Sequence, residues 1–220
     1  MIKIAVFDLD GTLVNSLTDI AQSVNKGLIK AGLEEKPFEN FNHYVGDGRE
    51  VMIKRAMGSF AEDEEKFSIA WETFNSEYKI HCNDNTCAYD GCAEMLKNLD
   101  EKGIKTAVLS NKPDEFVGRI LKKVYPEHSF TEAWGKKPKY KMKPDGESLL
   151  AILEKHGISK EECIYIGDSD VDVYTAQNSG VKMAGVAWGF RGREELLSTG
   201  APFVAATPKE LFDYITGNNE

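Results

Sequence analysis

The sequence predicts an α/β protein in which helices cover a parallel β-sheet and a helical domain is inserted after the first strand. Short β-branched runs alternate with longer stretches of helical period, which is typical of strand–helix–strand units. Residues 16–82 break this alternation, because they show helical periodicity and no convincing strand. The chain has 220 residues, 41% hydrophobic and 29% charged, which is the composition of an ordinary globular protein.

The first expected strand is Ile2–Phe7. The later expected strands are Ile104–Leu109, Cys163–Ile166, Met183–Trp188 and Phe203–Ala205. A helix is expected over Cys92–Lys102, since its apolar residues recur at helical spacing and Gly103 follows as a C-terminal stop. Ser148–Lys155, which ends just before Gly157, repeats the arrangement. These segments therefore predict consecutive strand–helix–strand units.

Two apolar stripes mark the inserted segment. Their members are Leu17, Ile20, Val24 and Leu28 in the first, and Phe67, Trp71, Phe74 and Tyr78 in the second. Two helices packed on the main core would also produce such stripes, but a strand-to-helix connection usually has only about 2 to 6 residues. We therefore expect a separate helical domain at 16–83 and a core domain formed by 1–15 and 84–220, with hinges at Asn15-Ser16 and at 83–86.

The charge of the chain excludes some partners. Acidic residues outnumber basic ones by 36 to 27, and the net charge of −9 disfavours binding to nucleic acid or to an anionic membrane. No stretch approaches the ~20 apolar residues that span a bilayer, and the first apolar run is too short for a signal peptide. We expect a cytoplasmic protein with reduced cysteines and no nucleic-acid or membrane partner.

The strongest chemical motif is Asp8-Leu9-Asp10-Gly11-Thr12, which follows the first strand directly. Residues two apart in an extended chain face the same side, so Asp8 and Asp10 can point toward one place. Such a pair suits Mg²⁺, or a division of labour between an ionised nucleophile and a protonated acid. The alternative is structural, with Asp10-Gly11 in a turn and Asp8 as a helix cap.

A second acidic cluster, Asp168-Ser169-Asp170-Val171-Asp172, follows the strand expected at Cys163–Ile166. Some of these residues would cap the next helix. Three acids within five positions repel one another, however, and a bound cation would relieve that repulsion. We therefore favour a cation site.

Two further candidates lie at comparable places. Ser110-Asn111-Lys112 ends the strand expected at Ile104–Leu109, and Lys143-Pro144 precedes the helix expected at Ser148–Lys155. Ser110 can donate a hydrogen bond to a phosphoryl oxygen, and Lys143 can neutralise its charge. A simple turn and a solvated lysine are the alternatives. Because ligands of open α/β sheets bind outside the carboxyl ends of the strands, the four clusters support one another.

With these motifs in this order, the sequence resembles the haloacid dehalogenase-like phosphatase superfamily. The matching positions are Asp8–Thr12, Ser110, Lys143, and Gly167-Asp168 with Asp172. The resemblance implies a doubly wound, Rossmann-like core with an inserted helical cap domain. Within the superfamily, the phosphoglycolate phosphatase family is most similar. That narrower resemblance rests on Tyr44–Gly48 with Arg55–Met57, on Gly167–Ala176 and on Trp188–Arg191.

The resemblance also implies a role for each motif residue. Asp8 would attack phosphorus and form an aspartyl-phosphate, while Asp10 would serve as general acid and base. Mg²⁺ would be held by Asp8, Asp168 and the backbone carbonyl of Asp10, with Asp172 in or near the second layer of ligands. The residues expected around the phosphoryl oxygens are Gly11, Thr12, Ser110, Asn111 and Lys143.

The cap would choose the leaving group. Its basic residues Arg49, Lys54 and Arg55 could bind a substrate carboxylate, although they could equally form the solvent-exposed face of a helix.

Cys82, Cys87 and Cys92 are spaced too widely for a typical zinc site, and we expect unligated thiols.

The expected function is Mg²⁺-dependent hydrolysis of a small anionic phosphorylated metabolite, with 2-phosphoglycolate as the leading substrate, by a monomer or homodimer. An inorganic pyrophosphatase, a nucleotide phosphatase or a sugar phosphomutase could use the same core. A receiver-like signalling module is the remote alternative. Such modules are about half as long and lack the inserted helical domain.

Overall fold

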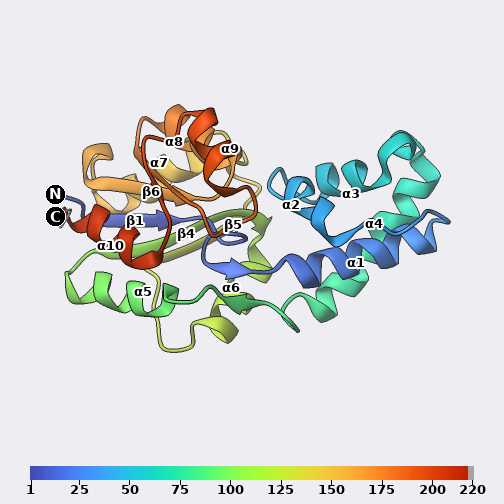
Figure 1. Cartoon of the computed structure of the whole chain (residues 1–220), viewed down its shortest axis with the longest axis horizontal. Helices are drawn as coiled ribbons and strands as arrows, with labels where there is room; N and C mark the ends of the chain where they lie inside the picture. The colour runs from blue at the N-terminus through green and yellow to red at the C-terminus, as the bar shows by residue number, and fades with distance from the viewer. Residues whose placement is uncertain (218–220) are drawn as a thin grey trace. The chain divides into compact units, whose positions relative to one another are not determined.

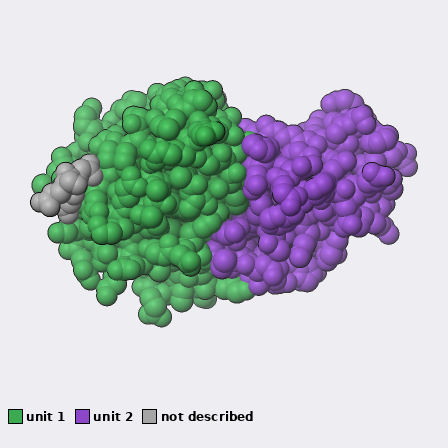
Figure 2. All heavy atoms as spheres, viewed as in Figure 1, with its two compact units in different colours: residues 1–14, 88–220 green, residues 15–87 purple. Residues whose placement is uncertain are grey.

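The computed structural model describes residues 1–217, and the chain divides into two compact units (Figure 2). One unit consists of residues 1–14 together with the chain from residue 88 onward, and the other consists of residues 15–87. The chain passes between them through two short strands, β2 (Val14–Asn15) and β3 (Cys87–Ala88), which pair with each other. The boundaries expected from the sequence were 15/16 and 83/84.

The first unit contains a six-stranded sheet in the order β5-β4-β1-β6-β7-β8, and each of its five neighbouring strand pairs is parallel. Its strands are β1 (Ile4–Phe7), β4 (Lys105–Pro113), β5 (Glu132–Lys136), β6 (Cys163–Gly167), β7 (Lys182–Val186) and β8 (Val204–Ala205). Strands were expected at five of these places. The sixth, β5, was missed because Glu-Ala-Trp-Gly-Lys is not an apolar β-branched run.

Helices cover both faces of this sheet, as Figure 1 shows. One face carries α5 (Cys92–Glu101), α6 (Asp114–Val124) and α10 (Pro208–Thr216). The opposite face carries α7 (Glu147–His156), α8 (Asp170–Ser179) and α9 (Gly192–Thr199). Parallel strands with helices on both faces confirm the predicted doubly wound α/β fold.

The central strand β1 explains where a ligand can bind. All four of its residues are fully buried, as expected for a strand that has neighbours on both sides and helices on both faces. It pairs with β4 on one side and with β6 on the other. The chain order reverses around β1, and the crevice at the carboxyl end of such a switch point is the usual ligand site in open α/β sheets.

The second unit is helical. Its longer helices are α1 (Leu17–Lys30), α3 (Arg49–Met57) and α4 (Glu64–His81), joined through α2 (Phe41–Tyr44) and the short 3₁₀ turns Phe38–Asn40 and Gly58–Phe60. The apolar stripe of α1 is buried throughout. On α4, Phe74 and Tyr78 are buried, whereas Phe67 and Trp71 are only half-buried.

A buried carboxylate ties together the two ends of this helical unit. Asp19 of α1 accepts hydrogen bonds from the backbone N–H and side-chain amide of Asn85 at 3.0 and 2.8 Å. It also accepts from the backbone N–H and hydroxyl of Thr86 at 2.8 and 2.6 Å.

Among residues 1–217, no helix is both long enough and apolar enough to cross a bilayer.

Candidate active site

Asp8 is the first residue after β1, and its backbone is fixed to the neighbouring strand. Its N–H donates to the Ile166 carbonyl at 2.8 Å. The chain then folds back, so that Leu13 and Val14 both donate to the Leu9 carbonyl at 3.0 Å. Gly11 allows this reversal with a φ of +87°, in the left-handed region that glycine tolerates best. The motif therefore leaves the sheet as a tight loop at the carboxyl end of β1.

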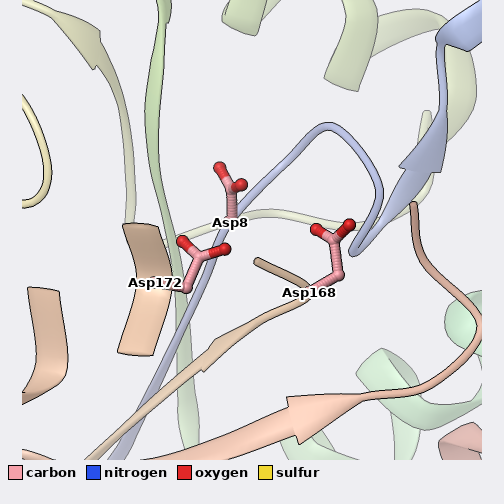
Figure 3. Close-up of side chains that lie close together, drawn as sticks. All are labelled: Asp8, Asp168 and Asp172. Atoms are coloured by element: carbon pink, nitrogen blue, oxygen red, sulfur yellow. The ribbon is translucent and has the colours of Figure 1, made fainter. Parts of the chain in front are cut away.

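Three carboxylates meet at this edge: Asp8 after β1, Asp168 after β6 and Asp172 in the first turn of α8. Each offers an oxygen within 4.8 Å of the oxygens of the other two, and all three residues are buried. Figure 3 shows their carboxyl groups projecting side by side from the ends of these elements. Two acidic motifs about 160 residues apart in the chain are thus brought together.

Asp168 is fixed from two directions. Its Oδ1 accepts from the Thr12 hydroxyl at 2.9 Å, and its Oδ2 accepts from the Phe190 N–H at 2.8 Å. The loop at Gly11 passes so close that a Cβ there would lie 2.2 Å from Asp168 Oδ2. A side chain at position 11 would therefore collide with this carboxylate.

Asp172 has both a capping role and an electrostatic one. Its Oδ2 accepts from the N–H and hydroxyl of Ser169 at 3.1 and 2.7 Å, which caps the start of α8. Its Oδ1 accepts from Lys143 Nζ at 2.8 Å and from the Tyr165 hydroxyl at 3.0 Å. Asp172 therefore caps the helix and also pairs with the buried lysine.

Lys143 is the cationic centre of the cluster. Its Nζ lies 2.9 Å from Asp8 Oδ1 and 3.0 Å from the Tyr165 hydroxyl, and the residue is 4% exposed. Burial alone would lower the pKa of Lys143, but the carboxylates of Asp172 and Asp8 outweigh burial and hold that pKa well above its usual value. Lys143 is therefore a permanently charged ammonium between two carboxylates.

The pKa values of two of these carboxyl groups are raised. Burial raises the pKa of Asp8 to about 7, although Lys143 opposes the rise and Asp172 adds to it. Burial also raises the pKa of Asp168 well above its usual value, and repulsion from Asp172 and Asp8 adds to the effect. Such shifts arise where like charges share a dry site, and they are common at functional sites.

These residues fit a divalent cation. Oxygen donors from several carboxylates are the ligands that Mg²⁺ prefers. Asp8 Oδ1 makes an ion pair with Lys143 but no hydrogen bond. Asp8, Asp10, Asp168 and Asp172 bring four carboxylates against the two ammonium groups of Lys112 and Lys143. With all four carboxylates ionised, as they would be around a bound cation, two negative charges are left over, which a divalent cation would balance.

The end of β4 supplies the other predicted residues. Ser110 and Asn111 are buried at 4% and 7% exposure. The Asn111 amide accepts from the Lys143 N–H at 2.9 Å and donates to the Lys143 carbonyl at 3.0 Å, so that it holds the backbone of that lysine. Lys112, next in the chain, donates to both carboxylate oxygens of Asp10 at 2.9 and 2.8 Å.

The predicted specificity residues lie in the helical unit. Arg49 begins α3, donates to the Asn75 side chain and lies with its guanidinium carbon 5.1 Å from the centre of the Trp71 ring. Arg55 pairs with Asp47 at 2.7 Å. Lys54 lies 3.7 Å from Glu50. Their contact with a substrate stays a prediction.

The cysteines form no metal cluster in the described part of the chain, where the aspartate triad is the one group of potential ligands. Cys82 and Cys92 are buried and Cys87 is exposed. Burial raises the pKa of Cys92 to about 12, which keeps it a neutral thiol.

Three contributors to the site were not identified from the sequence. Lys112 stands next to a predicted motif, but nothing in the local pattern shows that its carboxylate partner lies 102 positions earlier. Tyr165 sits inside an apolar strand and is typical of a core residue there. Phe190 contributes only its backbone N–H.

Comparison with known proteins agrees with this geometry. Residues 5–186 match the family of haloacid dehalogenase-like hydrolases. A phosphoglycolate phosphatase of Pseudomonas putida is 29% identical over 215 residues, which are 96% of this chain and 76% of the relative. A phosphoglycolate phosphatase of Haemophilus influenzae is 30% identical over 217 residues, with 96% and 94% covered.

A crystal structure from Lactobacillus delbrueckii subsp. bulgaricus has the same architecture. It superposes with a TM-score of 0.91 at 30% identity and covers 97% of this chain and 98% of its own. The family match, the relatives and the buried aspartate–lysine cluster agree. The chain therefore belongs to the haloacid dehalogenase-like hydrolase family, as its phosphatase relatives do.

Proposed function

We propose that this hydrolase is a Mg²⁺-dependent phosphatase that acts on a small anionic phosphorylated metabolite through an aspartyl-phosphate. The observation that carries the proposal is the buried cluster of Asp8, Asp168 and Asp172 around the Lys143 ammonium at the carboxyl edge of the sheet. Family membership as a hydrolase argues against the receiver-like signalling module.

Asp8 is the nucleophile in this proposal. Its carboxylate oxygen attacks phosphorus, the bond to the leaving oxygen breaks, and one difficult displacement becomes two easier ones. Asp10 gives its proton to the leaving oxygen and later takes a proton from the water that cleaves the aspartyl-phosphate. Lys143 and the Ser110 hydroxyl would lie around the transferred oxygens, where positioning and electrostatics provide most of the catalysis.

The cation would be held by Asp8, Asp168 and the backbone carbonyl of Asp10. It supplies positive charge that screens the repulsion between the nucleophile and the phosphate dianion. Asp172 would act mainly through Lys143, to which it is already bonded at 2.8 Å. The Thr12 hydroxyl and the Phe190 N–H would keep Asp168 oriented toward the ion.

The leading substrate is 2-phosphoglycolate, because relatives that match nearly the whole chain are phosphoglycolate phosphatases. The helical unit, residues 15–87, would act as a cap that excludes water and selects the leaving group. Arg49 and Arg55 are our candidates for binding the substrate carboxylate, since a guanidinium can hold it with two parallel hydrogen bonds.

The test is phosphate release from 2-phosphoglycolate, pyrophosphate, sugar phosphates and nucleotides, each with Mg²⁺ or with EDTA. Asp8→Asn removes the nucleophile but keeps its shape, so we expect turnover to fall to background. Asp100→Asn makes the same change at an exposed carboxylate of α5 and should leave the rate unchanged.

The outcomes separate chemistry from substrate. Mg²⁺-dependent release that is fastest for 2-phosphoglycolate and absent in Asp8→Asn supports the whole proposal. A preference for pyrophosphate, a nucleotide or a sugar phosphate would keep the chemistry and replace the substrate. Release from none of them by the folded protein would overturn the proposal.

A further inference from the structure

The ion pair between Lys112 and Asp10 is the strongest feature that the predicted motifs do not explain. Lys112 Nζ lies 2.9 Å from Oδ1 and 2.8 Å from Oδ2 of Asp10, so that one ammonium group binds both carboxylate oxygens. The side chains are only 5% and 11% exposed. In such a dry place an ion pair is far less screened than on the surface, and its geometry is far better defined.

An irregularity in β4 directs Lys112 toward Asp10. Leu109 pairs with Trp134 and Pro113 pairs with Lys136, so four steps along β4 match two along β5. Three residues, Ser110, Asn111 and Lys112, lie between these pairs on β4, whereas only Gly135 lies between them on β5. A bulge of this kind changes the direction of side chains at the end of a strand, and bulges are frequent beside active sites.

The bulge is itself braced by hydrogen bonds. The Lys112 N–H donates to the Ser110 hydroxyl at 3.2 Å, and Asn111 binds the Lys143 backbone through two hydrogen bonds. Consecutive residues of one bulge therefore hold two different parts of the site: Asn111 holds Lys143, and Lys112 holds Asp10.

We propose that Lys112 is a positioning residue for the general acid–base step, and that it acts by fixing the direction of the Asp10 carboxyl group. This inference rests on the proposed phosphatase function and deepens it. When the bond from phosphorus to the leaving oxygen breaks, its electron pair stays on that oxygen, which takes the proton from the Asp10 O–H. Before the transfer, one Asp10 oxygen carries the proton and the other accepts from Lys112; after it, Asp10 is the carboxylate that Lys112 binds through both oxygens.

An aspartate side chain can rotate about two bonds. Proton transfer needs the donor oxygen within hydrogen-bond reach of the leaving oxygen, and a misplacement of about 1 Å can cost on the order of 100-fold in rate. The Lys112 ammonium removes most of that freedom from Asp10. Its effect should therefore appear only when the leaving group needs a proton.

The experiment compares two small substrates in the full-length protein with Mg²⁺. The first is the alkyl phosphate preferred in the substrate panel, whose alkoxide must be protonated as it leaves. The second is acetyl phosphate, whose acetate leaves without a proton. The measured quantity is kcat/KM, because it reports the steps up to the first irreversible one, which is cleavage of the bond to the leaving group.

We expect Lys112→Met to lower kcat/KM for the alkyl phosphate by about tenfold to a hundredfold, and for acetyl phosphate by less than about threefold. Asp10→Asn should show the same selectivity. The double variant should be no worse than Asp10→Asn alone, since Lys112 acts only through Asp10. Lys122→Met removes the same charge from an exposed site on α6 and should change neither value.

Three results would overturn the inference. An equal loss on both substrates would mean that Lys112 acts on the phosphoryl group or on folding. No loss on either would remove its role, and a further loss in the double variant would show an action independent of Asp10. If Lys112→Met does not fold, Lys112→Gln takes its place, and its loss of kcat/KM on the alkyl phosphate is compared with its loss on acetyl phosphate in the same way. Failure of the phosphatase proposal is separate, because the unmodified protein would then release no phosphate from either substrate.

Discussion

At the scale of single residues, the site consists of charges that cannot be changed independently. Lys143 contacts Asp8, Asp172 and Tyr165, and each of these lies within the same dry volume. Tyr165 is fully buried, and its hydroxyl accepts from Lys143 and donates to Asp172. The Tyr165 hydroxyl thus gives the Lys143 ammonium a second hydrogen-bond acceptor beside Asp172.

Removing this hydroxyl should therefore destabilise the folded protein. We expect Tyr165→Phe to lower the free energy of unfolding by about 2 kcal/mol, because buried hydrogen bonds to charged groups contribute about 1.5 to 3 kcal/mol. Urea-induced unfolding at pH 7, followed by circular dichroism, measures the change.

The matched control for this change is Tyr174→Phe on α8, where the tyrosine is 44% exposed. We expect an effect close to zero there, since water replaces its hydrogen bonds. Equal losses in the two variants would show that the Tyr165 hydroxyl makes no special contribution to the charged cluster.

At the scale of elements, the sequence predicted five strands of the six-stranded sheet and missed its edge strand β5, as well as the short strands β2 and β3. β1 and β6 are apolar along their whole length and fully buried, so their pattern is unambiguous. β5 pairs only with β4, at the edge of the sheet, and three of its five residues, Glu132, Ala133 and Lys136, are not buried. Its formation depends on pairing with β4, which no local pattern records.

The same limit applies to the site. Asp8, Asp10, Asp168, Ser110 and Lys143 could be proposed because each follows a recognisable strand or precedes a recognisable helix, and the structure brings them to one edge. The Lys112–Asp10 pair depends on the bulge in β4, which appears only in the register between β4 and β5. The position of each motif at the end of a strand could therefore be predicted from the sequence, whereas the geometry between strands could not.

One prediction belongs to a single helix. Thr207 caps α10, because its hydroxyl accepts a hydrogen bond from the Glu210 N–H at 3.2 Å and Pro208 opens the helix. We expect Thr207→Ala to lower the free energy of unfolding by about 1 kcal/mol. Thr207→Ser keeps the hydroxyl and should retain most of that stability. Similar losses for serine and alanine in thermal unfolding would contradict the capping role.

At the scale of the whole molecule, the helical unit has its own stabilising anchor. Asp19 is 1% exposed and accepts hydrogen bonds from Asn85 and Thr86, which lie 66 and 67 positions later in the chain. The first helix of the unit is thus bonded to the segment through which the chain leaves it. This anchor lies entirely within residues 15–87.

We expect Asp19→Ala to destabilise the helical unit and leave the sheet unchanged. It removes the acceptor of the Asn85 and Thr86 N–H groups, and leaving the buried Thr86 N–H without an acceptor costs about 1 to 3 kcal/mol. Hydrogen exchange followed by mass spectrometry should show faster exchange in peptides covering 82–87 and unchanged exchange in peptides from β1 and β6.

Asp84→Ala is the control for the anchor, because the Asp84 side chain is 54% exposed and pairs with His81. It should alter exchange only slightly. Faster exchange throughout the sheet in Asp19→Ala would show that the two units do not unfold separately, and no change at 82–87 would show that Asp19 is not an anchor.

The pairing of β2 with β3 has a consequence for the evolution of this fold. It places the two points where the chain leaves and rejoins the first unit side by side. Loop-closure entropy grows only slowly with length, so the segment between two adjacent points can be lengthened, shortened or exchanged at little thermodynamic cost. A different module can therefore replace this segment during evolution while the sheet and its carboxylates stay the same.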